Sequence, residues 1–158
     1  MYQIEQKVIH ALYGLGTVEK IEEKNILGKL NRYAVISFQN ERMQIMVNLE
    51  QKSELIREPV TKDDVPRIME FLKECQSPLP VKSPDRFNIN MGKIKSADIY
   101  KLVEVIKDLS CLSKEKKLTP KELTMLKQSQ KMLCTEMCLV TEIASQEMEE
   151  MVERYSKS

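Results

Sequence analysis

The chain has 158 residues, of which 42% are hydrophobic and 31% charged, a composition typical of a globular protein rather than a disordered one. No apolar run approaches the roughly 18 residues of a membrane-spanning helix, and the first residues lack the basic start and apolar stretch of a signal peptide. We therefore expect a cytoplasmic protein with no membrane contact, in which the four cysteines stay reduced.

The net charge of +1 hides an uneven distribution of charge along the chain. Residues 82–131 hold 12 basic and 6 acidic side chains, a local charge of +6, whereas residues 132–158 hold 2 and 6, a local charge of −4. A cationic segment of this kind is compatible with a partner that carries phosphates, although a basic helical face is more often only solvated.

The first third of the chain has the two-residue alternation of β-strands. Gly14 and Gly16 lie between the first two strand runs, where a tight turn or bulge needs a residue without a Cβ. Strands are predicted over residues 7–11, 16–24, 32–39 and 42–48. Four short antiparallel strands within about 50 residues predict a small Tudor-like β-barrel over residues 1–60.

From about residue 61 the apolar period changes to that of helices. The clearest helix start is Thr119-Pro120-Lys121-Glu122, a capping box with proline at the first helical position. Earlier starts are predicted at the capping residues Asp64, Ser83 and Ser96. The prediction is thus a two-domain α+β protein, in which a small β-barrel precedes an all-helical bundle over residues 61–158.

Catalytic and metal-binding patterns are weak in this sequence. His10 lies inside a strand run without a nucleophile or an acid at a useful spacing, so we interpret it as structural. Cys134 and Cys138 are one helical turn apart, but no histidine or CxxC pair completes a metal site. No phosphate-binding glycine motif is complete. We expect no enzymatic activity, no metal and no cofactor.

Specific motifs occur in four segments of the chain. The segments are YQIEQKVIHALYGLGTVEKIE at 2–22, MQIMVN at 43–48, DRFNINMGKIKSADIYKLVEVIKDL at 85–109 and KLTPKELTML at 117–126. In order and spacing they resemble the CarD/CdnL family of bacterial transcription regulators over nearly the whole chain. The most specific pieces are the hydrophobic-G-x-G-x-V turn near 14–18, the K-x-x-S-x-D-[ILV] step at 93–99, the E-V-[IV]-[KR]-D-L helix and the L-[ST]-x-x-E helix start.

The resemblance implies a transcription regulator with two contact surfaces. In this family the Tudor-like domain binds the β subunit of RNA polymerase, and the helical domain touches promoter DNA at the upstream edge of the melted region, which modulates open complexes. The implied polymerase-binding residues are Lys24, Ile26, Arg42, Gln44 and Met46. The implied DNA-binding residues are Lys82, Ser83, Arg86, Lys93, Lys95 and Lys101.

Departures from the family pattern fall mainly in the DNA-facing part. The family inserts a tryptophan at the edge of the melted DNA, but this chain has no tryptophan, and Ser83 occupies that position. Asp85 replaces the first arginine of the following pair, while Arg86 keeps the second. In the barrel, Met46 stands where many members carry an arginine. We therefore expect weak, salt-dependent DNA binding without sequence specificity.

An alternative function avoids DNA altogether. The chain would then be an adaptor that binds only polymerase, or a peptide-binding adaptor that uses Tyr13, Tyr33 and Phe38 as an aromatic cage for a cationic side chain. Alternation along a strand places Tyr33 and Phe38 on opposite faces, which argues against the cage. We expect a monomer in either case.

Overall fold

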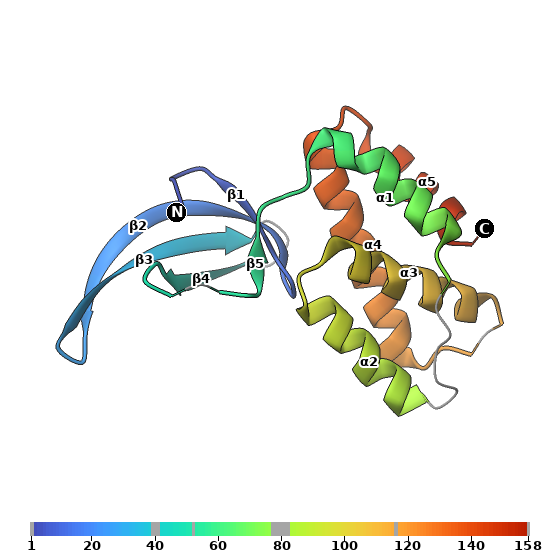
Figure 1. The fold of residues 1–158 in the computed structure, drawn as a ribbon, viewed down its shortest axis with the longest axis horizontal. Helices are drawn as coiled ribbons and strands as arrows, with labels where there is room; N and C mark the ends of the chain where they lie inside the picture. Colours follow the sequence, from blue (N-terminus) through green and yellow to red (C-terminus); the bar gives the residue numbers. More distant parts are fainter. Residues whose placement is uncertain (1, 39–41, 52, 77–82, 116, 158) are drawn as a thin grey trace. The chain divides into compact units, whose positions relative to one another are not determined.

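The computed structural model describes residues 2–38, 42–51, 53–76, 83–115 and 117–157. The chain forms two compact units, Met1–Pro59 and Val60–Ser158. Figure 1 shows that the first unit is built from strands and the second from helices. Within the described ranges, every helix is too short or too polar to cross a membrane.

The N-terminal unit contains one antiparallel sheet with the strand order β4-β3-β2-β1-β5. The strands are β1 Lys7–His10, β2 Gly14–Ile26, β3 Lys29–Phe38, β4 Met43–Asn48 and β5 Ile56–Arg57. The first four confirm the predicted strands, whereas β5 is too short to show an alternation. The Tudor-like class is confirmed, but the predicted barrel is not closed, because β4 and β5 are the two edges of the described sheet.

The core of this unit lies on one face of the sheet. It is formed by Val8, Val18, Ala34, Ile36 and Phe38, all of them buried. An irregularity between positions 18 and 20 of β2 shifts the side-chain alternation along that strand by one residue. Beyond this point the core-facing positions of β2 are therefore odd-numbered, and the even-numbered ones face away.

His10 completes this core at its edge, as an aromatic packing residue. Its Nδ1 accepts a hydrogen bond of 3.0 Å from the backbone N–H of Leu12. Its ring stacks on Tyr13 with centroids 4.5 Å apart and meets the edge of Phe38 at 5.8 Å. Burial lowers the pKa of this imidazole. The buried, neutral ring is therefore part of the packing.

Gly16 allows β2 to approach the core closely. A Cβ at this position would lie 2.8 Å from Ile36 Cγ2 and 2.8 Å from the ring of Phe38. We expect Gly16→Ala to lower the free energy of unfolding by about 1–3 kcal/mol, since the well-packed core must move to admit the methyl group. Urea unfolding of the full chain, followed by circular dichroism, measures this change.

Gly92→Ala provides the matched control for that substitution. Gly92 lies in a helix, and a Cβ there would meet nothing within 4 Å. Alanine should therefore stabilise the protein by about 0.5–1 kcal/mol through its higher helix propensity. If both alanines had the same effect, the close packing of β2 against the core would be contradicted.

The second unit, which we call the helical unit, is a bundle of helices. They are the short 3-10 helix η1 Lys62–Asp64 and the α-helices α1 Val65–Glu74, α2 Ser83–Lys95, α3 Ile99–Lys114, α4 Pro120–Val140 and α5 Ser145–Ser156. Helix α3 packs against α1, α2, α4 and α5 (Figure 1). Its side chains Val103, Ile106 and Leu109 are fully buried and form the centre of the bundle.

Three helix starts can be compared with their predicted caps. Asp64 occupies the N-cap position of α1 as predicted, but its side chain makes no capping hydrogen bond to that helix and accepts instead from the N–H of Thr61 at 2.9 Å. The capping box at the start of α4 is confirmed, because the Thr119 side chain accepts a hydrogen bond from the backbone N–H of Glu122. The predicted cap of α3 is wrong: its N-cap is Asp98, which accepts from the N–H of Tyr100 at 2.8 Å. The Ser96 hydroxyl instead donates to the carbonyl of residue 93 near the end of α2.

Candidate functional site

Four of the five residues that the family resemblance assigns to polymerase binding lie together on one face of the sheet. Val35 of β3 pairs with Lys20 on one side and Met46 on the other, so these three positions share a face. Ala34 and Ile36 point to the opposite, core-facing side. By strand alternation, the face away from the core, which we call the docking face, carries Lys24, Ile26, Gln44 and Met46. Arg42 is exposed, but it precedes β4 and forms an isolated bridge with the core residue Phe38, so alternation along β4 does not assign it to this face.

Polar contacts organise the centre of the docking face. The Lys24 ammonium lies 3.7 Å from the sulfur of Met46 and 3.7 Å from a carboxylate oxygen of Glu22. Glu22 also pairs with Lys20 at 2.6 Å, and the hydrogen bond with this lysine lowers the pKa of the Glu22 carboxyl. Met46 therefore packs against Lys24, and an arginine or lysine at position 46 would repel the Lys24 ammonium.

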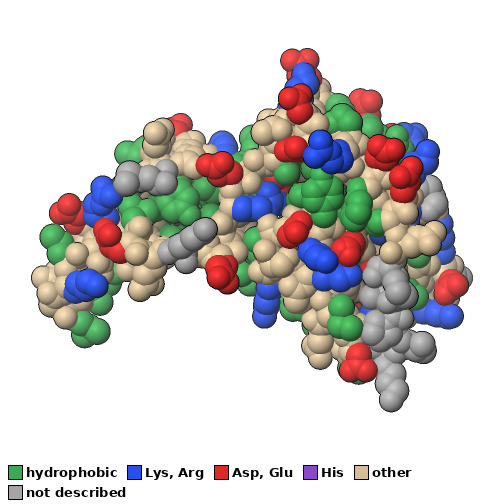
Figure 2. All heavy atoms as spheres, in the orientation of Figure 1, with side chains coloured by type: hydrophobic (Ala, Val, Ile, Leu, Met, Phe, Trp, Pro, Cys, Tyr) green, Lys and Arg blue, Asp and Glu red, His purple; other side chains and the backbone are tan. Residues whose placement is uncertain are grey.

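The hairpin between β2 and β3 extends beyond β4 as a two-stranded ribbon with an apolar end. The strands pair as far as Ile26 with Lys29, whereas β4 reaches only to the level of Tyr33. Near the turn Ile26 is 47% exposed, and Leu27 and Leu30 are exposed as well. Figure 2 shows these apolar side chains at the hairpin end. In the sequence, the pattern I-L-G-K-L at 26–30 indicated this apolar end. Only Ile26 was assigned to a binding surface from the sequence, and Leu27 and Leu30 were not.

The proposed aromatic cage does not form. The ring centroids of Tyr13 and Phe38 are 5.5 Å apart, and His10 contacts both rings on the core side. Tyr33 pairs across the sheet with Glu22, a docking-face residue, and therefore points to the opposite side from Phe38. The peptide-binding adaptor thus loses the cage on which it depended.

The residues that resemblance assigns to DNA binding are distributed over α2 and α3. Lys82 lies outside the described residues, and Ser83 is the first residue of α2. Lys95 is exposed at the end of α2. Lys93 and Lys101 lie 3.5 and 3.6 Å from the carboxylate of Glu104 on α3. One glutamate therefore compensates part of the charge of two candidate phosphate contacts.

Arg86 lies inside the helical unit rather than on its surface. Arg86 is 5% exposed, and its Nε and Nη2 each donate a hydrogen bond of 2.6 Å to the Glu122 carboxylate. These hydrogen bonds raise the pKa of the Arg86 guanidinium. A group held in this way has no access to DNA phosphates, so we leave Arg86 out of the DNA surface.

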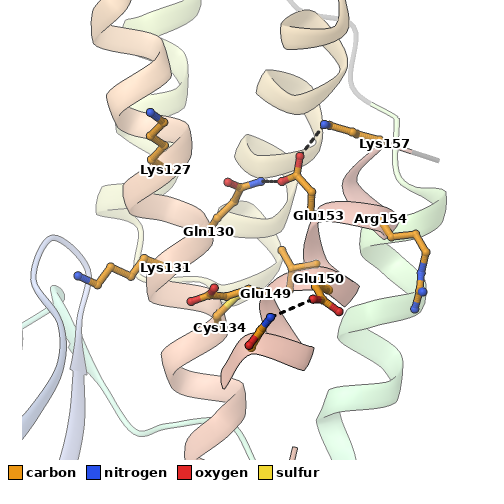
Figure 3. A pocket seen from close by; sticks show the side chains of 11 residues that line it. Lys127, Gln130, Lys131, Cys134, Glu149, Glu150, Glu153, Arg154 and Lys157 are labelled. Carbon is orange, nitrogen blue, oxygen red and sulfur yellow. Dashed lines mark hydrogen bonds and ion pairs between the residues drawn. The ribbon is translucent and has the colours of Figure 1, made fainter. Parts of the chain in front are cut away.

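A groove of about 760 Å³ lies between α4 and α5. Glu153 accepts a hydrogen bond from Gln130 and pairs with Lys157, whereas Lys131 and Arg154 point outwards (Figure 3). Cys134 lies at its floor, and burial raises the pKa of this thiol to about 12. In the described part of the chain, no three His, Cys, Asp or Glu side chains are placed to hold a metal ion.

Both units of the chain match domains of known proteins. Residues 2–60 match the CarD-like/TRCF RID domain, and residues 67–153 match the CarD C-terminal domain. The chain therefore belongs to the CarD family, which confirms the resemblance. It is also similar to YdeB of Bacillus subtilis (strain 168), a proposed transcription factor, with 29% identity over 150 residues that cover 93% of this chain and 97% of YdeB. These similarities support a role associated with transcription.

Proposed function

We propose that the chain is a non-enzymatic transcription regulator that binds the β subunit of RNA polymerase through the docking face. In this proposal the helical unit lies near upstream promoter DNA and modulates the open complex. The observation that carries the proposal is the convergence of four of the five candidate polymerase contacts, Lys24 and Ile26 from β2 and Gln44 and Met46 from β4, on one face with exposed side chains.

The chemistry of this face fits a protein partner that offers a strand and an acidic group. Strand β4 is an edge of the described sheet, so its outer backbone groups can pair with a strand of the partner. Gln44 and Met46 would then contact the partner with alternate side chains. Lys24 would approach an acidic side chain, and Ile26 extends the contact toward the apolar hairpin end.

Charge reversal on the docking face tests this proposal. We expect Lys24→Glu to weaken binding of the full chain to RNA polymerase at least about tenfold, because like charges across an interface repel. Biolayer interferometry with immobilised polymerase measures the affinity. Arg32→Glu is the matched control, since Arg32 is exposed and, opposite Glu23 in the β2–β3 register, lies on the other face of the sheet. Equal affinities for Lys24→Glu and the parent chain, or an equal loss with Arg32→Glu, would contradict the assigned face.

A second candidate function keeps the polymerase contact and omits DNA. It is favoured by the placement of Arg86 in the interior and by the compensation of Lys93 and Lys101 by Glu104. In the described part of the chain Lys95 is exposed and takes part in no ion pair, so it is the best-placed cation for a phosphate contact. Crosslinks from Lys95 to upstream DNA in an open promoter complex would support the first candidate, and crosslinks to polymerase alone the second.

A further inference from the structure

Helix α2 faces the helical unit with a stripe in which polar and apolar side chains are mixed. Its buried residues are Arg86, Asn90 and Ile94, which are spaced four apart and therefore lie on one side of the helix. Phe87 and Met91 are half-buried beside them. Ile94, which is 9% exposed, packs in the core of the bundle, and Phe87 and Met91 pack against that core from the same helix. These apolar contacts hold α2 against the bundle without fixing a direction, whereas polar contacts add directional constraints.

Of the two buried polar residues, only Arg86 provides an anchor. Asn90 is fully buried, and its amide makes no hydrogen bond with any described residue. The Arg86 guanidinium instead forms a two-point contact with Glu122 and also donates to the carbonyl of Lys117 at 3.4 Å. Two parallel hydrogen bonds fix the direction of the arginine side chain as well as its distance from the carboxylate.

The same carboxylate also belongs to the cap of α4. Glu122 is fully buried, and its Oε1 accepts a hydrogen bond of 3.2 Å from the backbone N–H of Thr119. The Thr119 hydroxyl in turn accepts from the N–H of Glu122. The acceptor that holds Arg86 is therefore itself held by the capping box of α4. The start of α4 fixes the first turns of α2 through one shared side chain.

Lys93 holds the other end of α2, and its contacts are longer. Its ammonium lies 3.5 Å from Glu104 and 3.8 Å from Asp108 on α3. These distances describe charge pairing without the two-point geometry at Arg86. The two-point contact at the start of α2 is thus more directional than these two ion pairs.

We propose that Arg86 is a positioning residue: through Glu122 it fixes the orientation of the first turn of α2, which contains Ser83 and Asp85. The biological meaning of this role rests on the proposed function, in which that turn approaches promoter DNA. The positioning itself does not depend on DNA. In this proposal Arg86, the second arginine of the family pair, lies in the interior of the protein, and contact with DNA is made by neighbouring residues.

The role of the two-point contact can be separated from stability by two variants of the full chain. Arg86→Lys keeps the charge but cannot form the planar two-point contact. The double variant Arg86→Met with Glu122→Gln removes both charges, while glutamine can still complete the capping box. Asn88→Met is the matched control, because Asn88 is exposed on the same helix.

Amide hydrogen exchange and thermal melting are the two measurements. We expect the amides of residues 86–90 to exchange at least about tenfold faster in both variants, while the double variant melts within a few degrees of the parent because it buries no unpaired charge. Asn88→Met should leave both quantities unchanged. Unchanged exchange in both variants would overturn the proposal. A double variant whose amides exchange at the parent rate would also overturn it, since apolar packing alone would then be enough to order the start of α2.

A reporter at the start of α2 gives a second readout. The chain has no tryptophan, so Ser83→Trp introduces a single indole at the first residue of the helix. We expect a larger fast component in its fluorescence anisotropy decay when Arg86→Lys is added, in the absence of DNA. An unchanged decay would overturn the positioning role. If the indole becomes mobile but open complexes respond equally to both proteins, the positioning role stands and the DNA-facing part of the proposed function fails.

Discussion

Replacement of Glu122 by alanine is expected to lower the free energy of unfolding by about 3–5 kcal/mol. The substitution leaves the Arg86 guanidinium in the interior without its carboxylate partner, and the desolvation of an uncompensated charge is costly. It also removes the acceptor for the N–H of Thr119 at the start of α4, which adds to the loss.

Urea unfolding of the full chain, followed by circular dichroism, measures this loss. Glu115→Ala is the control, because Glu115 forms an ion pair of 3.2 Å with Lys117 on the surface, where solvent screens the charges. Its loss should stay below about 1 kcal/mol. Equal losses for the two glutamates would show that the Arg86–Glu122 pair is as well solvated as a surface pair.

Local sequence signals predicted the elements that depend on a few neighbouring residues. The capping box at Thr119 spans four residues and formed as predicted. Two good capping residues, Ser96 and Asp98, stand within three positions, and only the structure shows that the first ends α2 while the second begins α3. The two-residue strand β5 depends on its pairing with β1, so its own sequence carries no pattern.

The candidate site was predictable only in part, for reasons of register and burial. Alternation places Lys24 with Ile26, and Gln44 with Met46, but whether the two pairs share a face depends on the irregularity after Val18. That irregularity has no clear sequence signature. The closed barrel was likewise a tertiary question, since it required the two edge strands to pair with each other.

Arg86 shows how a charged residue can be assigned to the wrong environment. Its partner Glu122 lies 36 positions later in the sequence, so no local pattern reveals the ion pair. One signal was available: Arg86 stands four and eight residues before Asn90 and Ile94, on the side of α2 that carries its buried aliphatic residue. A charge on such a stripe indicates a buried partner as readily as a solvent-facing contact.

Ser83→Trp is expected to lengthen the lifetime of open promoter complexes that contain this protein. Stacking of one base on an aromatic ring contributes roughly 1–3 kcal/mol, which corresponds to a factor of about five to 150 in lifetime. The anchor at Arg86 would hold the ring in a defined direction, because Ser83 lies less than one turn before it on α2. Decay of preformed complexes after addition of a competitor measures the lifetime.

The control for this substitution is Ile89→Trp, which adds the same ring at an exposed position farther along α2. It should leave the lifetime unchanged, because a ring that far from the helix start would lie away from the edge of the melted DNA. A gain that is specific to position 83 would place the start of α2 at that edge, even though this chain has no tryptophan of its own. No gain on any promoter, with folding and polymerase affinity intact, would contradict the DNA contact and favour the function that uses the docking face alone.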